Sequence, residues 1–304
     1  MPYAQSGVCA EANLHGIHLF FNVLDGKDSA LAAKLSVIND LQEKYNDQFS
    51  EALVSSIVAI GTQYWPHLWP SQMPKTLAGF PQFEHLEHAT PSRPIDLMVQ
   101  IRADRLDVVH LFVMDVITQL KDDVELIEQV TCFHYLDGRD LNGFIYGAAN
   151  PHGRKKQLVA LVADEDPTFS HGSYIHVQRF HYDLNGWSEL AKAEQEAVMG
   201  RAESNNQRLD YAPENCHAAR TEILDNQGTV KYLNQGMPFA DINQQGFLFI
   251  SCANDGYAFQ TLLKHRLGYI DDNGPDMWLE FAKSDFGAAF FAPSVNMLKA
   301  IGKQ

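Results

Sequence analysis

The chain has 304 residues, and its apolar and charged fractions of 45% and 20% are those of an ordinary globular protein with a sizeable core. Its formal net charge of −15 argues against nucleic acid or an anionic membrane surface as a partner, because phosphate-binding surfaces need clustered Lys and Arg. No basic segment precedes the first apolar stretch, and no run approaches the ~18 to 20 apolar residues of a membrane span, so we expect a cytoplasmic protein.

The first half of the chain has the strand and helix pattern of a ferredoxin-like unit. Its predicted elements are, in order, a strand at 15–23, a helix at 29–49, strands at 53–61 and 95–103, a helix at 105–120 and a strand at 124–136. Helical spacing is clearest at Leu31, Leu35 and Ile38, and the strands carry alternating or continuous apolar runs. The order β-α-β-β-α-β predicts such a unit over residues 1–150.

A polar linker with Gly and Pro, residues 150–157, leads into a second round of strands and helices. Its predicted elements are a strand at 172–184, a helix at 185–201, strands at 217–224 and 246–253, helical patterns at 257–268 and 275–284, and a last strand at 287–294. We therefore predict an α+β fold in which a second ferredoxin-like unit, residues 151–304, packs sheet against sheet on the first. Such packing leaves room for a cavity between one sheet and its helices.

Most residue patterns in the chain indicate no particular chemistry. There is no glycine-rich phosphate loop and no nucleophile-elbow spacing, so phosphate, dinucleotide and serine-hydrolase functions receive little support. The cysteines are widely spaced and lack a CxxC pattern, which favours reduced structural thiols; they are Cys9, Cys132, Cys216 and Cys252. The histidine pairs, at 15 and 18, 85 and 88, and 176 and 181, lack acidic or Cys ligands at metal spacing, and we interpret them as structural.

One segment of the chain is much more specific. Residues 133–151, FHYLDGRDLNGFIYGAANP, resemble the signature turn of the dye-decolorising peroxidases, which lies over the distal face of a haem. The matching positions are Arg139, Asp140, Leu141, Gly143, Phe144, Gly147, Asn150 and Pro151. The resemblance continues in the family's order through GSYIHVQRFHYDL, EQEAVMGR, CHAAR, MPF, GFLFISCA and FFAPS, so it covers nearly the whole chain.

The resemblance implies a haem b cofactor whose iron is bound by His217 in NCHAAR, because the histidine of that segment is the family's proximal ligand. An axial imidazole leaves one coordination position of the iron open, as peroxide or oxygen chemistry requires. A proximal histidine normally donates its second N–H to a carboxylate or carbonyl. Asp276 matches an acidic position of the family and is the candidate acceptor, although a helix N-terminal Asp stabilised by the dipole explains it equally well.

The chain departs from the family at both distal catalytic positions. The family's Asp in a G-x-x-D-G turn is replaced by Tyr146, and its Arg one strand later is replaced by Asn234. Missing acid–base help typically costs ~10²–10⁴ in rate and a missing charge costs a comparable factor, so usual peroxidase turnover is expected to be weak. The role of Tyr146 stays open: it can donate a hydrogen bond to an iron-bound ligand, coordinate iron, carry a radical or simply pack beside the porphyrin. Asn234 can hydrogen-bond a substrate without adding charge.

Further cofactor contacts are implied by the same resemblance. For the haem propionates we expect Arg179 and His176, with Arg220 as a weaker candidate, although Arg179 can equally pair with a surface carboxylate. Gly147 belongs to the distal turn and is expected to contact the haem. The aromatic residues that we expect to wall the pocket are Phe247, Phe249 and Phe259.

Three functions are consistent with these residues. The leading hypothesis is a haem-dependent oxidoreductase of the dye-decolorising peroxidase type, acting on a small molecule with hydrogen peroxide or oxygen. A second is a non-peroxidative enzyme whose nitrogen- or oxygen-containing substrate binds iron directly, and a third is a haem carrier or sensor without turnover. The family commonly forms dimers or rings, so the resemblance also implies a homo-oligomer, most simply a dimer.

Overall fold

The computed structural model describes residues 3–301 apart from 84–87, 165, 225–227 and 229–230. Its N-terminal unit contains, in order, η1 (Ser6–Val8), β1 (His15–Val23), α1 (Asp28–Gln48), η2 (Ser50–Ala52), β2 (Ser55–Gly61), α2 (Trp65–Leu68), β3 (Leu97–Ala103), α3 (Leu106–Leu120) and β4 (Val124–Phe133). The strands pair antiparallel in the order β4-β1-β3-β2. The β-α-β-β-α-β order predicted for this half is thereby confirmed, with α2 as a short addition.

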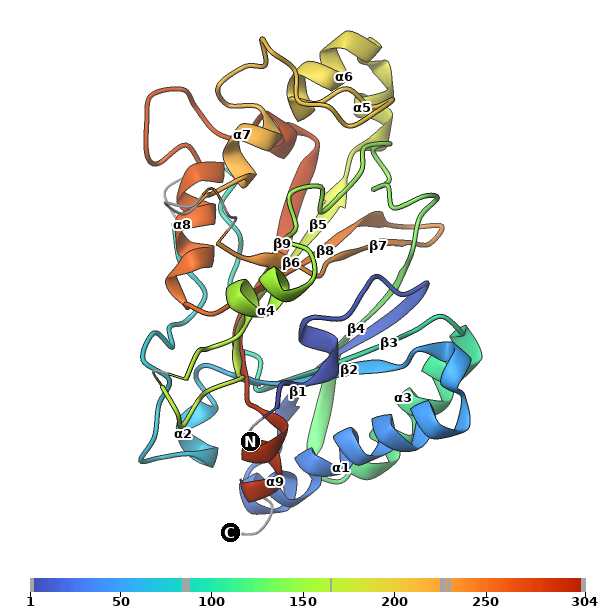
Figure 1. The fold of residues 1–304 in the computed structure, drawn as a ribbon, viewed down its shortest axis with the longest axis vertical. Helices are drawn as coiled ribbons and strands as arrows, with labels where there is room; N and C mark the ends of the chain where they lie inside the picture. The colour runs from blue at the N-terminus through green and yellow to red at the C-terminus, as the bar shows by residue number, and fades with distance from the viewer. Residues whose placement is uncertain (1–2, 84–87, 165, 225–227, 229–230, 302–304) are drawn as a thin grey trace.

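The two long helices of this unit cover one face of its strands (Figure 1). The apolar positions of α1 and α3 face the sheet, so that Leu35 and Phe112 are fully buried against Leu19 and Val99 of the strands. This follows from the helical period, which places apolar residues three and four apart on one side of the helix. The opposite face of the same strands is left for the second unit.

The C-terminal unit has the same arrangement with longer connections. Its elements are α4 (Arg154–Ala160), β5 (Ser173–Tyr182), α5 (Leu184–Glu189), α6 (Lys192–Met199), α7 (His217–Thr221), β6 (Leu233–Asn234), β7 (Met237–Ala240), β8 (Gln245–Ala253), α8 (Tyr257–Arg266), η3 (Met277–Glu280), β9 (Ala282–Ala292) and α9 (Val295–Ile301). The strand order is β9-β5-β8-β6, and β7 also pairs with β8. In both units the first strand lies between the last and the third, as the ferredoxin-like fold requires.

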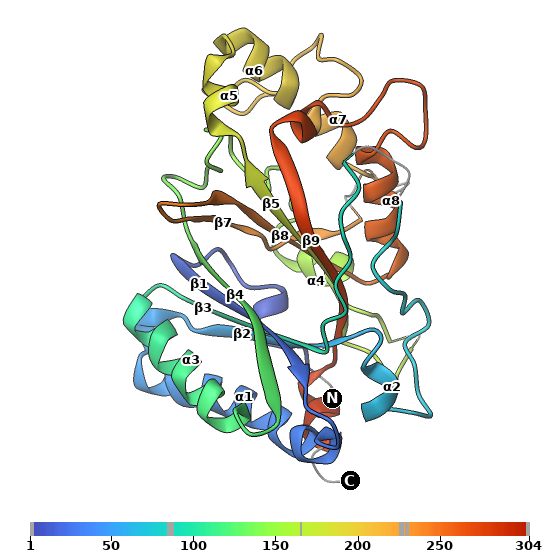
Figure 2. The ribbon, with the colours of Figure 1, turned by 180° about the vertical axis from the view of Figure 1, so that it is seen from behind.

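The two units share one sheet and one interior. β2 pairs with β9 at Ile60 and Phe291, so the described strands form a continuous nine-stranded sheet. The sheet turns so that strands of both units face one another, and Phe20 and Met98 pack with Ile175 and Ile250 in a single apolar cluster. Figure 2 shows the same two layers from behind, with α9 returning to lie beside α1. The predicted α+β fold with two ferredoxin-like units is confirmed.

Three predicted elements of the second half were wrong. Residues 217–224 form the short helix α7 and not a strand, because the Ala-rich HAART segment favours a helix and is too short for alternation to be informative. The helix predicted at 185–201 is two helices, and the second begins at Lys192, where Glu194 accepts a hydrogen bond from the Ala191 N–H. The segment 275–284 contains only the turn η3, after which β9 begins at Ala282.

Three smaller predictions can also be compared with the structure. Residues 150–157, predicted to be a linker, contain the start of α4, which ends at Ala160, and β5 begins only at Ser173. His85, one of the histidines that we interpret as structural, lies outside the described residues. Within the described ranges, none of the helices has the length and apolar character needed to cross a lipid bilayer.

Candidate active site

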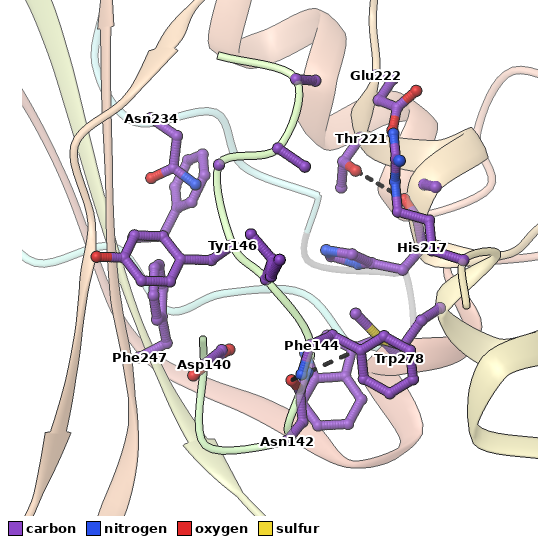
Figure 3. Close-up of a pocket in the computed structure, with 18 of the residues that line it drawn as sticks. Asp140, Asn142, Phe144, Tyr146, His217, Thr221, Glu222, Asn234, Phe247 and Trp278 are labelled. Carbon is purple, nitrogen blue, oxygen red and sulfur yellow. Dashed lines mark hydrogen bonds and ion pairs between the residues drawn. The ribbon is translucent and has the colours of Figure 1, made fainter. Parts of the chain in front are cut away.

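A pocket opens where the turn that follows β4 meets the C-terminal unit, and helices α7 and α8 lie on its other side (Figure 3). Its empty volume is about 980 Å³, part of which is open to solvent. Walls that are mostly apolar, with a few polar groups, are typical of cofactor sites. The apolar wall comes from the strands and α8, through Phe180, Phe247, Phe249 and Leu262. Polar groups face this space as well, among them His217 and Asn234.

His217 is the one histidine among the described residues that line the pocket. It is the first residue of α7, and its ring points into the space, as Figure 3 shows. The Nδ1 atom lies 2.9 Å from Oδ2 of Asp276, whose side chain is fully buried. The side chain of His217 is 28% exposed, so its second nitrogen is open to the pocket. An imidazole held in this way is a typical ligand for a metal ion.

The Asp276 carboxylate is fixed by three donors. Besides His217, the Arg266 guanidinium donates through Nε to Oδ2 at 2.9 Å, and the Trp278 backbone N–H donates to Oδ1 at 3.0 Å. Burial alone raises the pKa of the Asp276 carboxyl, but the charges and hydrogen bonds of His217 and Arg266 hold that pKa well below its usual range. The carboxylate therefore stays ionised and accepts the N–H of His217 Nδ1, so Nε2 is the ring nitrogen that is directed into the pocket.

A tight turn forms the wall opposite His217. Arg139 donates through Nη1 to the carbonyls of Gly143 and Glu203, at 2.7 and 3.0 Å, which closes the turn. Gly147 adopts a φ of 63°, a left-handed conformation that side chains other than glycine rarely adopt. The chain thereby reverses directly after Tyr146, and Gly147 lines the pocket as the resemblance implies.

The same wall contains Asn234, from a distant part of the sequence. The Asn150 side chain accepts the Asn234 N–H at 2.9 Å and donates to the Asn234 carbonyl at 2.8 Å, so the turn and β6 are clamped together. The Asn234 side-chain oxygen accepts the Gly236 N–H at 2.8 Å. Tyr146 and Asn234, the two positions singled out from the sequence, are thus brought side by side at the pocket.

Tyr146 packs edge-on against Phe247, with ring centroids 5.3 Å apart. Figure 3 shows its hydroxyl directed away from His217, and that hydroxyl forms no hydrogen bond with any described residue. Burial raises the pKa of the phenol, while Arg102 in the N-terminal unit acts in the opposite direction. The tyrosine is therefore neutral at physiological pH and presents mainly its ring to the pocket.

The structure does not bring Arg179 or His176 into contact with the pocket. Arg179 pairs with Asp285, at 2.9 and 2.7 Å, and with Glu128 at 3.0 Å. Successive residues of a strand face opposite sides, and because Phe180 lines the pocket, Arg179 points to the other side of β5. His176 is buried beneath the ring of Phe259, with centroids 4.6 Å apart.

Two arginines that the sequence did not single out line the pocket instead. Arg266 holds Asp276 and stacks over Phe180, and Arg201 forms an ion pair with Glu222. Arg220, the weaker candidate, pairs with Asp271 and lies outside the lining. In the sequence, Arg266 is one of three consecutive basic residues in the last turn of α8. That pattern predicts an exposed arginine as readily as a buried one, so it could not identify Arg266 as a pocket residue.

Asp140 is a further lining residue that sequence reasoning left without a role. It matches the family turn, but its position at the pocket depends on the fold of that turn. Its Oδ2 accepts the Tyr182 hydroxyl at 2.6 Å and its Oδ1 accepts the Leu141 N–H at 2.7 Å. Burial raises the pKa of the Asp140 carboxyl to about 7, against the two hydrogen bonds that favour its charged form.

Comparisons with known proteins agree on one family. The model described as Dyp-type peroxidase, N-terminal, matches residues 5–134, and the one described as Dyp-type peroxidase, C-terminal, matches residues 137–297. A dye-decolorizing peroxidase of Rhodococcus erythropolis is 30% identical over 287 residues, which are 93% of this chain and 84% of the relative. The two family models together cover most of the chain, so it is an oxidoreductase of the peroxidase class, and it belongs to the Dyp-type peroxidase family.

Solved structures give the same result over the full length. A Shewanella oneidensis structure assigned to the dyp-type peroxidases has a TM-score of 0.95 and 36% identity, and the match covers 99% of each chain. A variant of Rhodococcus jostii DypB in complex with heme has a TM-score of 0.92 and 29% identity, covering 98% of this chain and 99% of that one. The suspected family is thereby confirmed.

Proposed function

We propose that this chain binds haem b with His217 as the axial iron ligand and uses it as an oxidoreductase. The observation that carries the proposal is the 2.9 Å contact between His217 Nδ1 and Asp276, which leaves the other ring nitrogen facing a pocket with mostly apolar walls. A carboxylate partner makes an imidazole a stronger donor to iron. The haem would supply redox-active iron with one open coordination position.

The pocket residues fit such a group. Apolar and aromatic side chains suit the porphyrin faces, and His217 supplies a nitrogen ligand of the kind that haem iron takes. Arg201 is our candidate partner for a haem propionate in place of Arg179, because it lines the pocket and its Glu222 partner is shared with Arg208. A guanidinium can pair with a carboxylate through two hydrogen bonds.

We propose that the reaction at the distal side differs from that of the family. Tyr146 and Asn234 stand where the family has a carboxylate and a guanidinium, and neither carries charge at neutral pH. The Asn234 side-chain N–H groups donate to no described residue, which supports a role in binding a polar ligand. Hydrogen peroxide is the expected oxidant, and turnover should be slow because no cation at position 234 stabilises developing negative charge, a loss that typically costs ~10²–10³ in rate.

The uncharged residues at positions 146 and 234 also favour a second candidate, a non-peroxidative enzyme whose substrate binds the iron directly. The two candidates are separated by oxidation of a dye with hydrogen peroxide by the haem-loaded protein. A steady-state rate well above that of free haem supports the peroxidase. A rate equal to that of free haem rejects it, and anaerobic titration of the ferrous form with small ligands then separates the second enzyme from a carrier or sensor.

The remaining proposals concern the chain as a whole. We propose a division at residue 150, supported by the two strand sets with equivalent order on either side of it. A cytoplasmic location is supported by four free cysteines, which suit a reducing compartment. A homodimer is proposed from the family resemblance, and light scattering on the purified protein measures its mass directly.

A further inference from the structure

The pocket contains a carboxyl group that the sequence comparison with the family did not lead us to expect in this role. Asp140 lies six residues before Tyr146 on the same turn and is one of the lining residues, yet it is only 7% exposed. Figure 3 shows it below Tyr146, on the same side of the space. The chain thus lacks an acid at position 146 but has one nearby on the same wall.

The backbone around Asp140 holds this carboxyl in place. The Asp140 N–H donates to the Phe144 carbonyl at 2.8 Å, and the Asp140 carbonyl accepts the Gly143 N–H at 2.9 Å. The neighbouring Asn142 carbonyl accepts the Trp187 indole N–H at 3.0 Å. With both ends of the turn closed, the backbone that carries the carboxyl is fixed, and a defined position is what a proton-transfer group needs.

Each oxygen of the Asp140 carboxyl accepts one hydrogen bond, and the two donors differ. Oδ1 is occupied by the Leu141 N–H of the turn itself. Oδ2 is contacted by the Tyr182 hydroxyl at 2.6 Å, and Tyr182 is also a lining residue. The atom that can exchange a proton with a molecule in the pocket is therefore Oδ2, either directly or through the Tyr182 hydroxyl.

The charge surroundings of Asp140 leave it free to titrate. No Lys, Arg or His of the described residues forms an ion pair with it. The titratable groups that face it are Tyr182 on β5 and Tyr146 on its own turn, and Arg266 of α8 acts on Tyr182. With burial as the main influence, the pKa of Asp140 lies at about 7, where a general base works well in both directions.

We propose that Asp140 is the proton acceptor of the pocket, a catalytic residue that takes over from the family's acid at position 146. This rests on the proposed function. A weakly acidic ligand such as hydrogen peroxide binds as its anion when its O–H bond breaks and the proton forms a new O–H bond at Asp140 Oδ2. No electrons are exchanged in this step, and the protonated carboxyl can later return the proton to a leaving group.

Cyanide tests this step without turnover, because it enters as the neutral acid and binds ferric haem as the anion. Imidazole is the matched ligand, since it binds without giving up a proton. In the haem-loaded protein, Asp140→Asn should lower the association rate of cyanide at pH 7 about 100-fold and leave that of imidazole unchanged. Asp137→Asn, an exposed carboxyl on the same turn and outside the lining, should change neither rate.

Two further variants keep the test decisive. Adding Tyr146→Asp to Asp140→Asn returns an acid to the family's position and should restore most of the cyanide rate. If Asp140→Asn does not fold, Tyr182→Phe replaces it: loss of the hydrogen bond that lowers the pKa of Asp140 should move the pH midpoint of cyanide binding upward.

The proposal is overturned if Asp140→Asn binds cyanide at the wild-type rate, or if it slows cyanide and imidazole equally, which indicates a packing role. An unchanged pH midpoint in Tyr182→Phe contradicts it as well. Failure of the haem proposal looks different, because neither ligand then changes the absorption spectrum of any variant.

Discussion

Oδ2 of Asp276 lies 2.9 Å from Nδ1 of His217 and equally far from Nε of Arg266, so one carboxylate oxygen orients both the proposed iron ligand and a buried arginine. Asp276→Asn removes the charge but keeps the size. We expect iron with a higher reduction potential and haem affinity or activity lower by about 10- to 100-fold. A spectroelectrochemical titration measures the first effect, with the exposed Asp272→Asn as control. A potential equal to that of the wild type contradicts this role.

Restoring the family's charged pair should raise peroxide turnover. Tyr146→Asp together with Asn234→Arg places an acid and a cation on the wall opposite His217, where the wild type has neutral groups. Because Asp140 already offers an acid on this wall, the cation at position 234 should account for most of the gain, and we expect steady-state dye oxidation about 100-fold faster than in the wild type. No gain in a double variant that still binds haem contradicts the account of the distal wall.

The buried Asp140 carboxyl should make stability depend on pH. Its pKa is about 7 in the folded state against an ordinary ~3.9, so the folded chain keeps a proton that the unfolded chain has lost. Its contribution is full below about pH 4 and is lost as pH rises towards 7. Asp140→Asn removes this dependence. As pH rises from 5 to 8, the free energy of unfolding measured in urea should fall by about 2 kcal/mol more in the wild type than in the variant. A difference between the two proteins that does not change with pH contradicts the burial argument.

One polar side chain ties the units together close to the site. Gln235, next to Asn234, accepts from Nη2 of buried Arg102 at 2.8 Å, and its amide donates to the carbonyls of Val8 and Ala10 at 3.0 and 3.1 Å. Gln235→Met leaves a buried guanidinium short of an acceptor, because the other hydrogen bonds of Arg102 are long ones to the backbone carbonyls of Gly7 and residue 235, at 3.3 and 3.4 Å. We expect unfolding free energy to fall by about 3 kcal/mol, measured in urea. The exposed Gln244→Met should change it by less than ~0.5 kcal/mol.

The fold could be predicted well wherever a single periodicity dominates. The alternation in β1 and the helical spacing of Leu31, Leu35 and Ile38 each identify one element, and the order of elements then selects the ferredoxin-like unit. Periodicity does not identify short elements reliably. HAART is five residues long, and at that length alternation cannot be told from the start of a helix, so α7 was predicted as a strand.

The site could be predicted only as far as the motif reaches. Tyr146, Asn234, His217 and Asp276 match or replace family positions, and the structure gathers them around one pocket. The prediction for Arg179 failed because successive residues of a strand face opposite sides of the sheet. The motif contains both Arg179 and Phe180, and it does not indicate which of the two lines the pocket. The pKa of Asp140 depends on burial by residues from distant segments, which a linear sequence does not display.

The most direct measurement is the absorption spectrum of the haem-loaded protein compared with that of His217→Ala. Our account predicts a strong Soret band in the wild type, and in the variant a band that is lost or displaced and that returns when imidazole is added. A colourless wild-type protein, or a variant with the wild-type band, would contradict it.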